Sequence, residues 1–261
     1  MKKKVQIMGI INATNDSFYS KSRVGSIDIA LARASEMIEQ GATILDIGAC
    51  STRPGSIPVD EKTEISNSTP IIRALREQYK NITISIDTFR TSVASSAIDA
   101  GADIINDISG GDEDMLSLLK ESGKKYVLTH NSTIPYPVLE DNVLYIDRVI
   151  DWFTERVNYL SSMGIEDIII DPGFGFGKTI EENYHLLSHL DMFNCFNMPI
   201  LAGLSRKSMI YKPLDISPDK ALGGTMVLNA YAISQGASIL RVHDVKEASQ
   251  VIKLVEMISN N

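Results

Sequence analysis

Cysteine, tryptophan and long apolar runs are scarce in this sequence of 261 residues. Its two cysteines, Cys50 and Cys195, lack the spacing of a C-x-x-C pair or a metal-ligand set, so neither a disulfide framework nor a structural zinc site is expected. No run of about 18 apolar residues is present that could span a bilayer. The segment MKKKVQIMGII leads into the polar residue Asn12 without the apolar stretch of a signal peptide. We therefore expect a cytoplasmic protein.

Positive charge is also in deficit. The chain has 25 Lys and Arg residues against 33 Asp and Glu residues, which gives a net charge of -8. This balance disfavours nucleic acid or an anionic membrane as the main partner. An anionic small-molecule substrate would then need a local cluster of lysine and arginine.

The stretch DPGFGFGKT, residues 171–179, carries three glycines at alternate positions and then a Lys-Thr pair. A nucleotide P-loop has the form G-x-x-x-x-G-K-[ST], but Pro172 takes the place of the first glycine. A dinucleotide fingerprint, G-x-G-x-x-G, fails because Lys178 stands at the last glycine position. The segment therefore needs an explanation other than nucleotide binding.

Apolar stretches of strand length alternate with amphipathic helical stretches along the whole chain. Eight strands are expected, at residues 6–12, 43–48, 82–87, 103–108, 125–130, 167–173, 199–205 and 238–243. Four glycines are expected to close helices as left-handed caps: Gly41, Gly101, Gly164 and Gly236. Apolar strands joined by helices favour parallel pairing, so the pattern predicts an α/β fold, a closed (β/α)8 TIM barrel in a single domain over residues 1–261. A doubly wound open sheet is the alternative.

Every expected strand ends in something polar. Because active sites of TIM barrels lie at the C-terminal ends of the strands, these residues are expected to converge: Asn12, Asp46, Asp87, Asn106 with Asp107, His130, Asp171, Ser205 with Arg206 and Lys207, and Arg241 with His243. Acceptors for a polar heterocycle come from Asp87, Asn106 and Asp171. Donors for an anion come from Arg53, Lys207, Arg241 and His243. Any single residue could instead stabilise a turn.

Two expected strand-to-helix loops are unusually long. One is NATNDSFYSKSRVGS, which begins at Asn12, and the other is GACSTRPGSIPVDEK, which follows the second strand. Their length and their glycine, serine and proline content are typical of mobile covers or functional loops. A plain surface insertion is the alternative.

Seven segments together resemble the dihydropteroate synthase family, in chain order: IMGIINATNDSF, LDIGACSTRPG, ISIDTF, ADIINDISGG, IIIDPGFGFGKT, ILAGLSRKSMI and ILRVHDVKE. The resemblance extends from about Met8 to Lys246. It implies a pterin-binding TIM barrel and a folate-pathway transferase of an alkyl group. The implied reaction condenses 6-hydroxymethyl-7,8-dihydropterin diphosphate with p-aminobenzoate, giving dihydropteroate and diphosphate. Mg2+ is the implied cofactor and a homodimer the implied assembly.

The resemblance also implies roles for individual residues. Pterin contacts are implied for Asp87, Asn106, Asp171 and Lys207, and further substrate contacts for Phe176 and Gly203. The diphosphate site is implied to contain Arg241 and His243, joined by Asn12, whose amide oxygen helps to hold Mg2+. The p-aminobenzoate pocket and its mobile cover are implied to contain Phe18, Thr52, Arg53, Pro54 and Ser208. The implied catalytic residues are Arg53, Asp87, Asp171, Lys207 and Arg241.

The implied chemistry fits these residue types. Diphosphate leaves a CH2 group on an electron-rich pterin, so C–O cleavage can precede amine attack and leave a delocalised cation. Cationic groups and Mg2+ neutralise the leaving group, and Asp87 and Asp171 stabilise the cation. Because the arylamine is already nucleophilic, Cys50 and Ser205 are interpreted as structural residues. In the DPGFGFGKT stretch, Asp171 would bind the pterin N–H edge while the glycines let the backbone pass close to a flat ligand.

The sequence departs from the family's usual form in three places. Asn15 replaces a proline and YSKSR replaces SDGG in the first loop, strand five ends in T-H-N rather than M-H-M, and A-C follows strand two where G-E is frequent. These changes leave loop closure, the p-aminobenzoate pocket and sensitivity to sulfonamides open. Two rival functions are a methyltetrahydrofolate:corrinoid methyltransferase and a pterin-binding protein without turnover.

Overall fold

The computed structural model describes residues 4–13, 23–49, 59–134 and 144–259. Eight strands form one parallel sheet: β1 Gln6–Asn12, β2 Ile44–Gly48, β3 Thr83–Asp87, β4 Ile104–Asp107, β5 Lys125–Thr129, β6 Ile168–Asp171, β7 Leu201–Ala202 and β8 Ile239–Val242. Each expected strand is therefore present, although the seventh is only two residues long.

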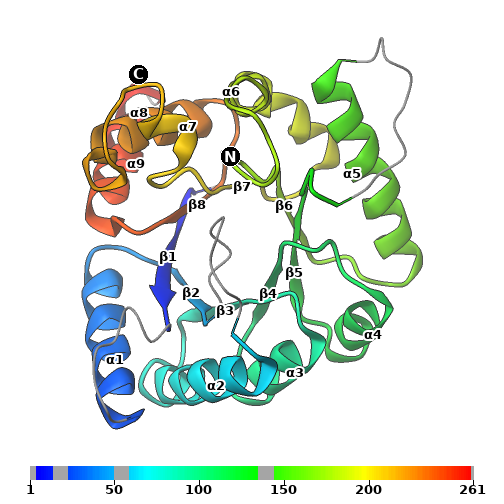
Figure 1. Cartoon of the computed structure of the whole chain (residues 1–261), viewed down its shortest axis with the longest axis vertical. Helices are drawn as coiled ribbons and strands as arrows, with labels where there is room; N and C mark the ends of the chain where they lie inside the picture. Colours follow the sequence, from blue (N-terminus) through cyan, green and yellow to red (C-terminus); the bar gives the residue numbers. More distant parts are fainter. Residues whose placement is uncertain (1–3, 14–22, 50–58, 135–143, 260–261) are drawn as a thin grey trace.

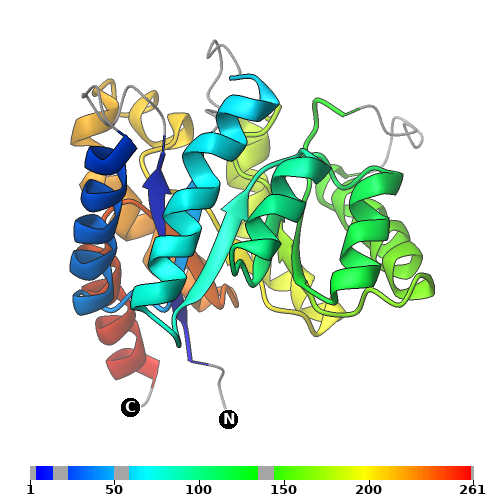
Figure 2. The same ribbon diagram turned by 90° about the horizontal axis from the view of Figure 1, so that it is seen from below.

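Helices surround the ring of strands (Figure 1) and run alongside them in the side view (Figure 2). The α-helices in the described residues are α1 Arg23–Glu39, α2 Glu61–Gln78, α3 Thr91–Asp99, α4 Glu113–Ser122, α5 Tyr145–Ser162, α6 Ile180–Ser188, α7 Ser208–Tyr211, α8 Leu222–Ser234 and α9 Val245–Ser259. Two short 3-10 helices are η1 Leu190–Phe196 and η2 Pro218–Lys220. None of the helices in this described part of the chain is long and apolar enough to cross a membrane.

The sheet closes into a barrel. The strand order is β6-β5-β4-β3-β2-β1-β8-β7, and a bridge between Ile170 and Ile200 joins the two ends. The Ile170 N–H donates to the Pro199 carbonyl at 2.9 Å across this seam. The predicted TIM barrel is confirmed, and the alternative of an open doubly wound sheet is wrong.

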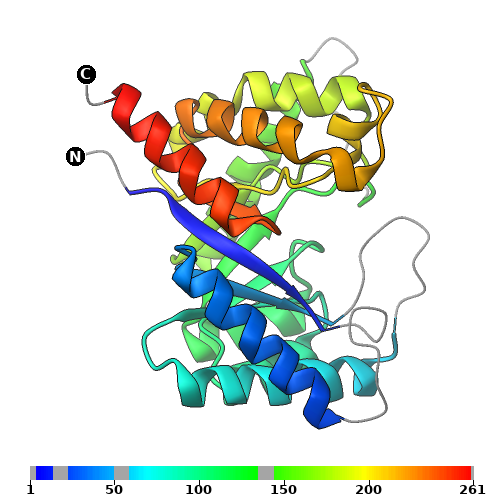
Figure 3. The same ribbon diagram turned by 90° about the vertical axis from the view of Figure 1, so that its left-hand side faces the viewer.

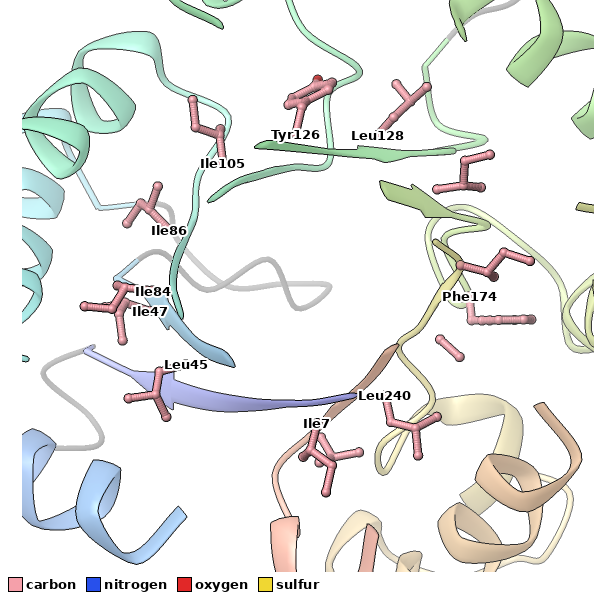
Figure 4. Packing of buried hydrophobic residues seen from close by; sticks show 14 of the residues in the cluster. Ile7, Leu45, Ile47, Ile84, Ile86, Ile105, Tyr126, Leu128, Phe174 and Leu240 are labelled. Atoms are coloured by element: carbon pink, nitrogen blue, oxygen red, sulfur yellow. The ribbon is translucent and has the colours of Figure 1, made fainter. Parts of the chain in front are cut away.

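Side chains alternate between the two faces of each strand. One set fills the bottom of the barrel interior: Met8, Ile44, Ile104, Val127, Ile169, Leu201 and Ile239. Their chain neighbours, such as Leu45, Tyr126 and Leu240, lie on the outer side of the ring against the helices (Figure 4). Two residues further along a strand, the inward position is often polar, as at Asp46, which follows Ile44. The barrel therefore has an apolar floor with a polar layer above it.

Local signals in the sequence explain how the elements begin and end. The Asp60 side chain accepts a hydrogen bond from Thr63 N at 3.0 Å and caps α2, and Thr179 begins α6 in a capping box. All four predicted glycine caps have positive φ, between 85° and 110°. β1 starts at the end of the barrel where α9 ends (Figure 3), so the strand C-terminal ends lie at the opposite mouth.

Candidate active site

A partly buried arginine on β8 connects to side chains of β2 and β3 at the mouth. Arg241 on β8 reaches across β1, donating from Nε to Asp46 Oδ2 on β2 at 2.7 Å and from Nη2 to Asp87 Oδ2 on β3. Asn106 on β4 donates from Nδ2 to the same Asp46 oxygen at 3.2 Å. Asp46 is fully buried. Four inward positions therefore form one connected polar cluster, which we call the Arg241 cluster.

Burial and charge act against each other in this cluster. Burial raises the pKa of Asp87 to about 7, although Arg241 acts to lower it and Asp46 adds to the rise. Burial acts to lower the pKa of Arg241, but the carboxylates of Asp46 and Asp87 outweigh it and raise that pKa above its ordinary value. Arg241 is therefore a fixed cation, whereas Asp87 can change its charge near neutral pH.

A second charged pair lies on the other side of the barrel. Asp171 Oδ1 at the end of β6 accepts from Gly173 N at 2.8 Å. Lys207 Nζ donates to the Phe174 carbonyl and lies 4.7 Å from the centre of the Phe176 ring. Burial lowers the pKa of Lys207 to about 8, opposed by Asp171, and burial raises the pKa of Asp171, opposed by Lys207. The predicted residues Asp171, Phe176 and Lys207 are thus brought together.

Gly203 and Gly175 leave space around the Lys207 side chain. A Cβ atom on Gly203 would lie 3.7 Å from Lys207 Nζ, and one on Gly175 would lie 3.3 Å from its Cδ. The predicted contact residue Gly203 therefore lines the ammonium group of Lys207. The contact at Gly175 is tight, so a side chain there would require Lys207 to shift, whereas the distance at Gly203 is an ordinary contact.

The glycines after β6 also have a reason within the protein. Gly173, Gly175 and Gly177 all have positive φ. A Cβ on Gly173 would stand 1.9 Å from the His130 carbonyl oxygen, and one on Gly177 would stand 2.7 Å from Thr133 N. Backbone of the loop after β5, rather than a ligand alone, excludes side chains here. That these glycines also let the backbone pass close to a flat ligand stays a prediction.

Lys178 ties these two loops together, a role that the sequence did not suggest. Its Nζ donates to the carbonyls of His130 at 2.9 Å, Gly173 at 2.8 Å and Phe176 at 3.3 Å. Three acceptors match the three donors of an ammonium group. The lysine that makes the segment look like a P-loop is thus bound to carbonyl oxygens of its own scaffold.

Two further predicted residues meet near β7 and β8. Ser205 Oγ and His243 Nδ1 are 2.9 Å apart, and His243 N donates to the same oxygen at 3.3 Å. Ser208 begins the short helix α7. Arg206 is paired with Asp244 through Nε–Oδ2 at 2.8 Å and Nη2–Oδ1 at 2.9 Å. Arg206 is therefore bound at the rim, and Ser205 orients the His243 ring.

Asn12 ends β1, which lies between β2 and β8, two strands of the Arg241 cluster. It is partly buried and pairs in register with Gly48 on β2. Within the described ranges, no group of three or more His, Cys, Asp or Glu residues is placed to hold a metal ion. A hard cation at Asn12 would therefore depend on the amide oxygen, water and oxygens of a ligand, as Mg2+ sites at phosphates commonly do.

Comparisons with known proteins show which family this chain belongs to. A family model described as pterin binding enzyme matches residues 8–243. Dihydropteroate synthases from Clostridium beijerinckii and Escherichia coli K12 are 39% and 38% identical, covering 98% and 96% of this chain and 94% and 90% of their own lengths. The chain belongs to the dihydropteroate synthase family. It is accordingly an enzyme of this kind, a transferase of the dihydropteroate synthase type.

Solved structures of dihydropteroate synthases have the same fold. The enzyme from Clostridium difficile, crystallised in the presence of pteroic acid, aligns with a TM-score of 0.91 at 35% identity and covers 100% of this chain and 98% of that one. The Yersinia pestis enzyme in a sulfonamide drug complex aligns with a TM-score of 0.89 at 35% identity, covering 99% and 95%. The family and fold predicted from the sequence are confirmed.

Not every strand-end residue faces the mouth of this dihydropteroate synthase barrel. Asp107 accepts from Tyr126 Oη at 2.9 Å behind the sheet. The His130 ring packs edge-on against Trp152 with centroids 5.0 Å apart, and burial lowers its pKa to about 3. The predicted convergence is wrong for these two residues, because alternation turns them outward. On β5 the inward polar residue is Thr129, one position earlier.

Four residues that the family resemblance implied lie outside the described residues: Phe18, Thr52, Arg53 and Pro54. Their roles stay predictions. The effects of the departures at Asn15 and Cys50, which also lie outside the described residues, stay predictions as well. Three residues of the described site escaped the sequence-based assignment of roles, namely Asp46, Thr129 and Lys178. Counting inward positions by twos from the apolar floor finds the first two, whereas no periodic signal identifies Lys178.

Proposed function

We propose that this chain condenses 6-hydroxymethyl-7,8-dihydropterin diphosphate with p-aminobenzoate, giving 7,8-dihydropteroate and diphosphate, with C–O cleavage ahead of amine attack. The observation that carries the proposal is Arg241, a fixed cation held by two carboxylates beside the predicted pterin acceptors. Membership of the dihydropteroate synthase family supports the same reaction.

The pterin is proposed to lie between the two charged clusters. Asp171 and Asn106 offer oxygen acceptors to ring and exocyclic N–H groups. Lys207, whose ammonium lies beside the Phe176 ring, offers a donor for a pterin oxygen or nitrogen on the opposite edge. Both Asp171 and Asn106 are less than a tenth exposed, so water competes weakly for these hydrogen bonds.

Departure of diphosphate needs positive charge at the mouth. Arg241 supplies a permanent cation, and the Ser205–His243 contact orients the imidazole for a second donor. The donor set at Asn12 fits Mg2+, which would be held by its amide oxygen and the diphosphate and would supply further charge neutralisation to the leaving group. The loop containing Arg53 is proposed to add another cation.

Negative charge in the same site is proposed to stabilise the pterin cation. Asp87 and Asp171 lie on β3 and β6, and both are largely shielded from solvent, where fixed charges act strongly. No covalent nucleophile is required, because the neutral arylamine attacks the exposed CH2 group and then loses its proton. Ser205 is already engaged with His243, which supports its assignment as a structural residue.

A homodimer and a cytoplasmic location are proposed as well. Apolar side chains on α8 and α9 are exposed, including Val227 at 66% and Ile258 at 77%. On α8, Val227 and Tyr231 are four residues apart and share one face. A second copy of the chain would cover such a surface. Light scattering at micromolar concentration tests this assembly, and a monomer would contradict it.

Product formation tests the reaction directly. The enzyme is mixed with the pterin diphosphate and p-aminobenzoate, with and without Mg2+, and dihydropteroate is quantified across a sulfonamide titration. We expect magnesium-dependent turnover that vanishes when the pterin lacks diphosphate. The diphosphate requirement separates this function from that of a corrinoid methyltransferase. Tight pterin binding without product would favour the non-catalytic rival.

A further inference from the structure

Asp46 is the one carboxylate of the Arg241 cluster to which the family resemblance gives no role. It lies on β2 with a fully buried side chain. Its Oδ2 accepts from Arg241 Nε at 2.7 Å and from Asn106 Nδ2 at 3.2 Å. Its Oδ1 is buried without a partner among the described residues. Two predicted substrate-binding side chains are therefore fixed by a residue below them.

Stability alone does not explain this carboxylate. A buried acceptor without a partner costs folding free energy, and replacing buried ion pairs by apolar residues is often neutral or stabilising. The positions before it on the same face are apolar, because Ile44 and its neighbours form the floor of the barrel. A charged residue at this depth therefore requires another reason.

The contact with Asn106 determines which end of its amide faces the ligand. An amide has donors on nitrogen and acceptors on oxygen, whereas an ionised carboxylate only accepts. Asn106 must therefore turn Nδ2 toward Asp46, which directs Oδ1 away from it. The Asn106 amide oxygen has no partner among the residues that the structure describes. It is left as an acceptor for an N–H group of the pterin.

The contact with Asp46 also fixes the orientation of the Arg241 guanidinium. Asp46 and Asp87 bind Nε and Nη2, which lie along one edge of the planar guanidinium. Nη1 has no partner within the described ranges. Because two carboxylates hold one edge, the remaining donors of Arg241 are directed elsewhere in a fixed orientation.

We propose that Asp46 is a positioning residue, which sets the Asn106 amide to present oxygen to the pterin and sets Arg241 to present its free donors to the diphosphate. This inference rests on the proposed function and deepens it. Asp46 does not touch the substrate. It acts through two side chains that do, so its contribution disappears when they are removed.

Three variants of the full chain separate positioning from packing. Asp46→Ala removes both hydrogen bonds. Asp46→Asn keeps an oxygen for Arg241 and Asn106 but loses the charge. Ser85→Ala is the matched control. Ser85 on β3 pairs in register with Asp46 on β2, and its buried Oγ also lacks a partner among the described residues. It removes a polar atom beside Asp46 without touching Asn106 or Arg241.

Calorimetric binding of 6-hydroxymethylpterin gives the first readout. Asp46→Ala frees the Asn106 amide to turn a donor toward the N–H groups of the pterin in place of its acceptor, so we expect affinity to fall about 100-fold. Asp46→Asn is expected to stay within about 10-fold of wild type, and Ser85→Ala within about 3-fold. The KM for p-aminobenzoate should change little in all three. An Asp46→Asn protein that folds normally but binds as weakly as Asp46→Ala would overturn the proposal.

A double-mutant cycle with Asn106→Ala gives the second readout. If Asp46 acts through Asn106, the combined variant binds the pterin no more weakly than Asn106→Ala alone. If the fold-losses in pterin affinity of Asp46→Ala and Asn106→Ala multiply in the combined variant, the positioning role of Asp46 is refuted. If Asp46→Ala does not fold, the same cycle is run with Asp46→Asn, whose small loss must also vanish beside Asn106→Ala. Wild-type turnover, measured separately, tests the proposed reaction, so failure of one does not hide failure of the other.

Discussion

Arg241 and Lys207 both carry positive charge at the mouth of the barrel, but different parts of the chain hold them. Arg241 is bound by side chains of β2 and β3, and each of its partners sits on a strand. Lys207 is bound to a carbonyl and an aromatic ring of the loop after β6. That loop is in turn held by Lys178. One cation is thus fixed by the barrel itself and the other by a clamped loop.

This difference has consequences for mutation and pH. The members of the Arg241 cluster are fixed by the strands that carry them. The removal of one member therefore leaves charged side chains in the interior without partners. Lys207 can shift when the loop after β6 is weakened. Such a change should reduce activity only partly, while the barrel stays folded. The following predictions are arranged from the largest expected effect to the smallest.

Arg241→Met should have the largest effect. It leaves the carboxylates of the fully buried Asp46 and the largely buried Asp87 without their cation, so we expect the free energy of unfolding to fall by about 3–5 kcal/mol. Loss of a charge-assisted contact to the leaving group should lower kcat/KM by about 10^3-fold or more. Urea unfolding and steady-state kinetics measure the two effects.

Arg76→Met is the matched control for Arg241→Met. Arg76 on α2 pairs with Asp103 and donates to the Gly101 carbonyl at 2.9 Å, near the strand starts rather than the mouth. It should cost stability without changing KM or kcat. Equal kinetic losses in both variants would show that Arg241 matters only for folding.

Asp171→Asn tests the acceptor of the loop-held side. We expect the fold to persist, because an amide oxygen can still accept from Gly173 N. Pterin affinity should fall about 100-fold, because one acceptor becomes a donor facing a donor. Calorimetry measures the affinity, and Asp167→Asn at the other end of the strand, with a mostly exposed carboxylate, serves as control. Unchanged pterin binding would remove Asp171 from the site.

Lys178→Met tests whether the loop clamp matters. It frees three carbonyls, of His130, Gly173 and Phe176. The loop that carries Phe174 and Phe176 should then move away from Lys207. We expect kcat/KM for the pterin diphosphate to fall by about 30-fold, in line with the lost hydrogen bonds to a charged group. Circular dichroism should remain unchanged.

Lys178→Arg refines that test, since arginine keeps the positive charge and offers five donors in a planar fork. Partial recovery relative to Lys178→Met would support a clamp through hydrogen bonds to the carbonyls. Full activity in the methionine variant would show that the glycines hold the loop without it.

The pH dependence of kcat/KM should reflect both clusters. Asp87, with a pKa raised to about 7, is needed in its ionised form to stabilise the pterin cation, so activity rises as pH increases through that value. Lys207, with a pKa lowered to about 8, is needed as the cation, so activity falls above it. Together these two dependences give a bell-shaped profile of kcat/KM with its maximum between the two pKa values. A flat profile from pH 6 to pH 9 would contradict both assignments.

Variants assign the two limbs of that profile. Lys207→Arg keeps its charge at all these pH values and should remove the alkaline limb from whatever activity remains. The acid limb, which belongs to the strand-held cluster, should survive in that variant. Loss of both limbs together would mean that the two clusters titrate as one unit.

The sequence predicted the barrel because apolar alternation and glycine caps are local signals. Ile44, Ile104 and Ile169 mark the floor, and the polar inward positions follow two residues later. The same rule would have excluded Asp107 and His130, because each directly follows an inward-facing residue and therefore points outward. Strand ends alone do not encode direction. Counting positions along each strand does.

Lys178 and the partner of Asp46 show what such counting leaves out. The contacts of Lys178 join the loop after β5 to the loop after β6, 48 residues apart in the case of His130. The partner of Asp46 on β8 lies 195 residues away. Neither pairing has a sequence signature, because barrel closure rather than local pattern brings these groups together. Their roles become visible only in the folded barrel.

Ser205→Ala should have the smallest effect. Ser205 contacts His243 through ring and backbone nitrogens, so its loss loosens one donor of the diphosphate site while Arg241 stays fixed by its carboxylates. We expect kcat/KM to fall by less than about 10-fold, the value of one ordinary hydrogen bond. Lys207→Ala, measured beside it, should lose far more. A loss above about 10^4-fold in Ser205→Ala would instead indicate covalent catalysis by its hydroxyl. In that case the serine, and neither of the two cations, would be the centre of the reaction.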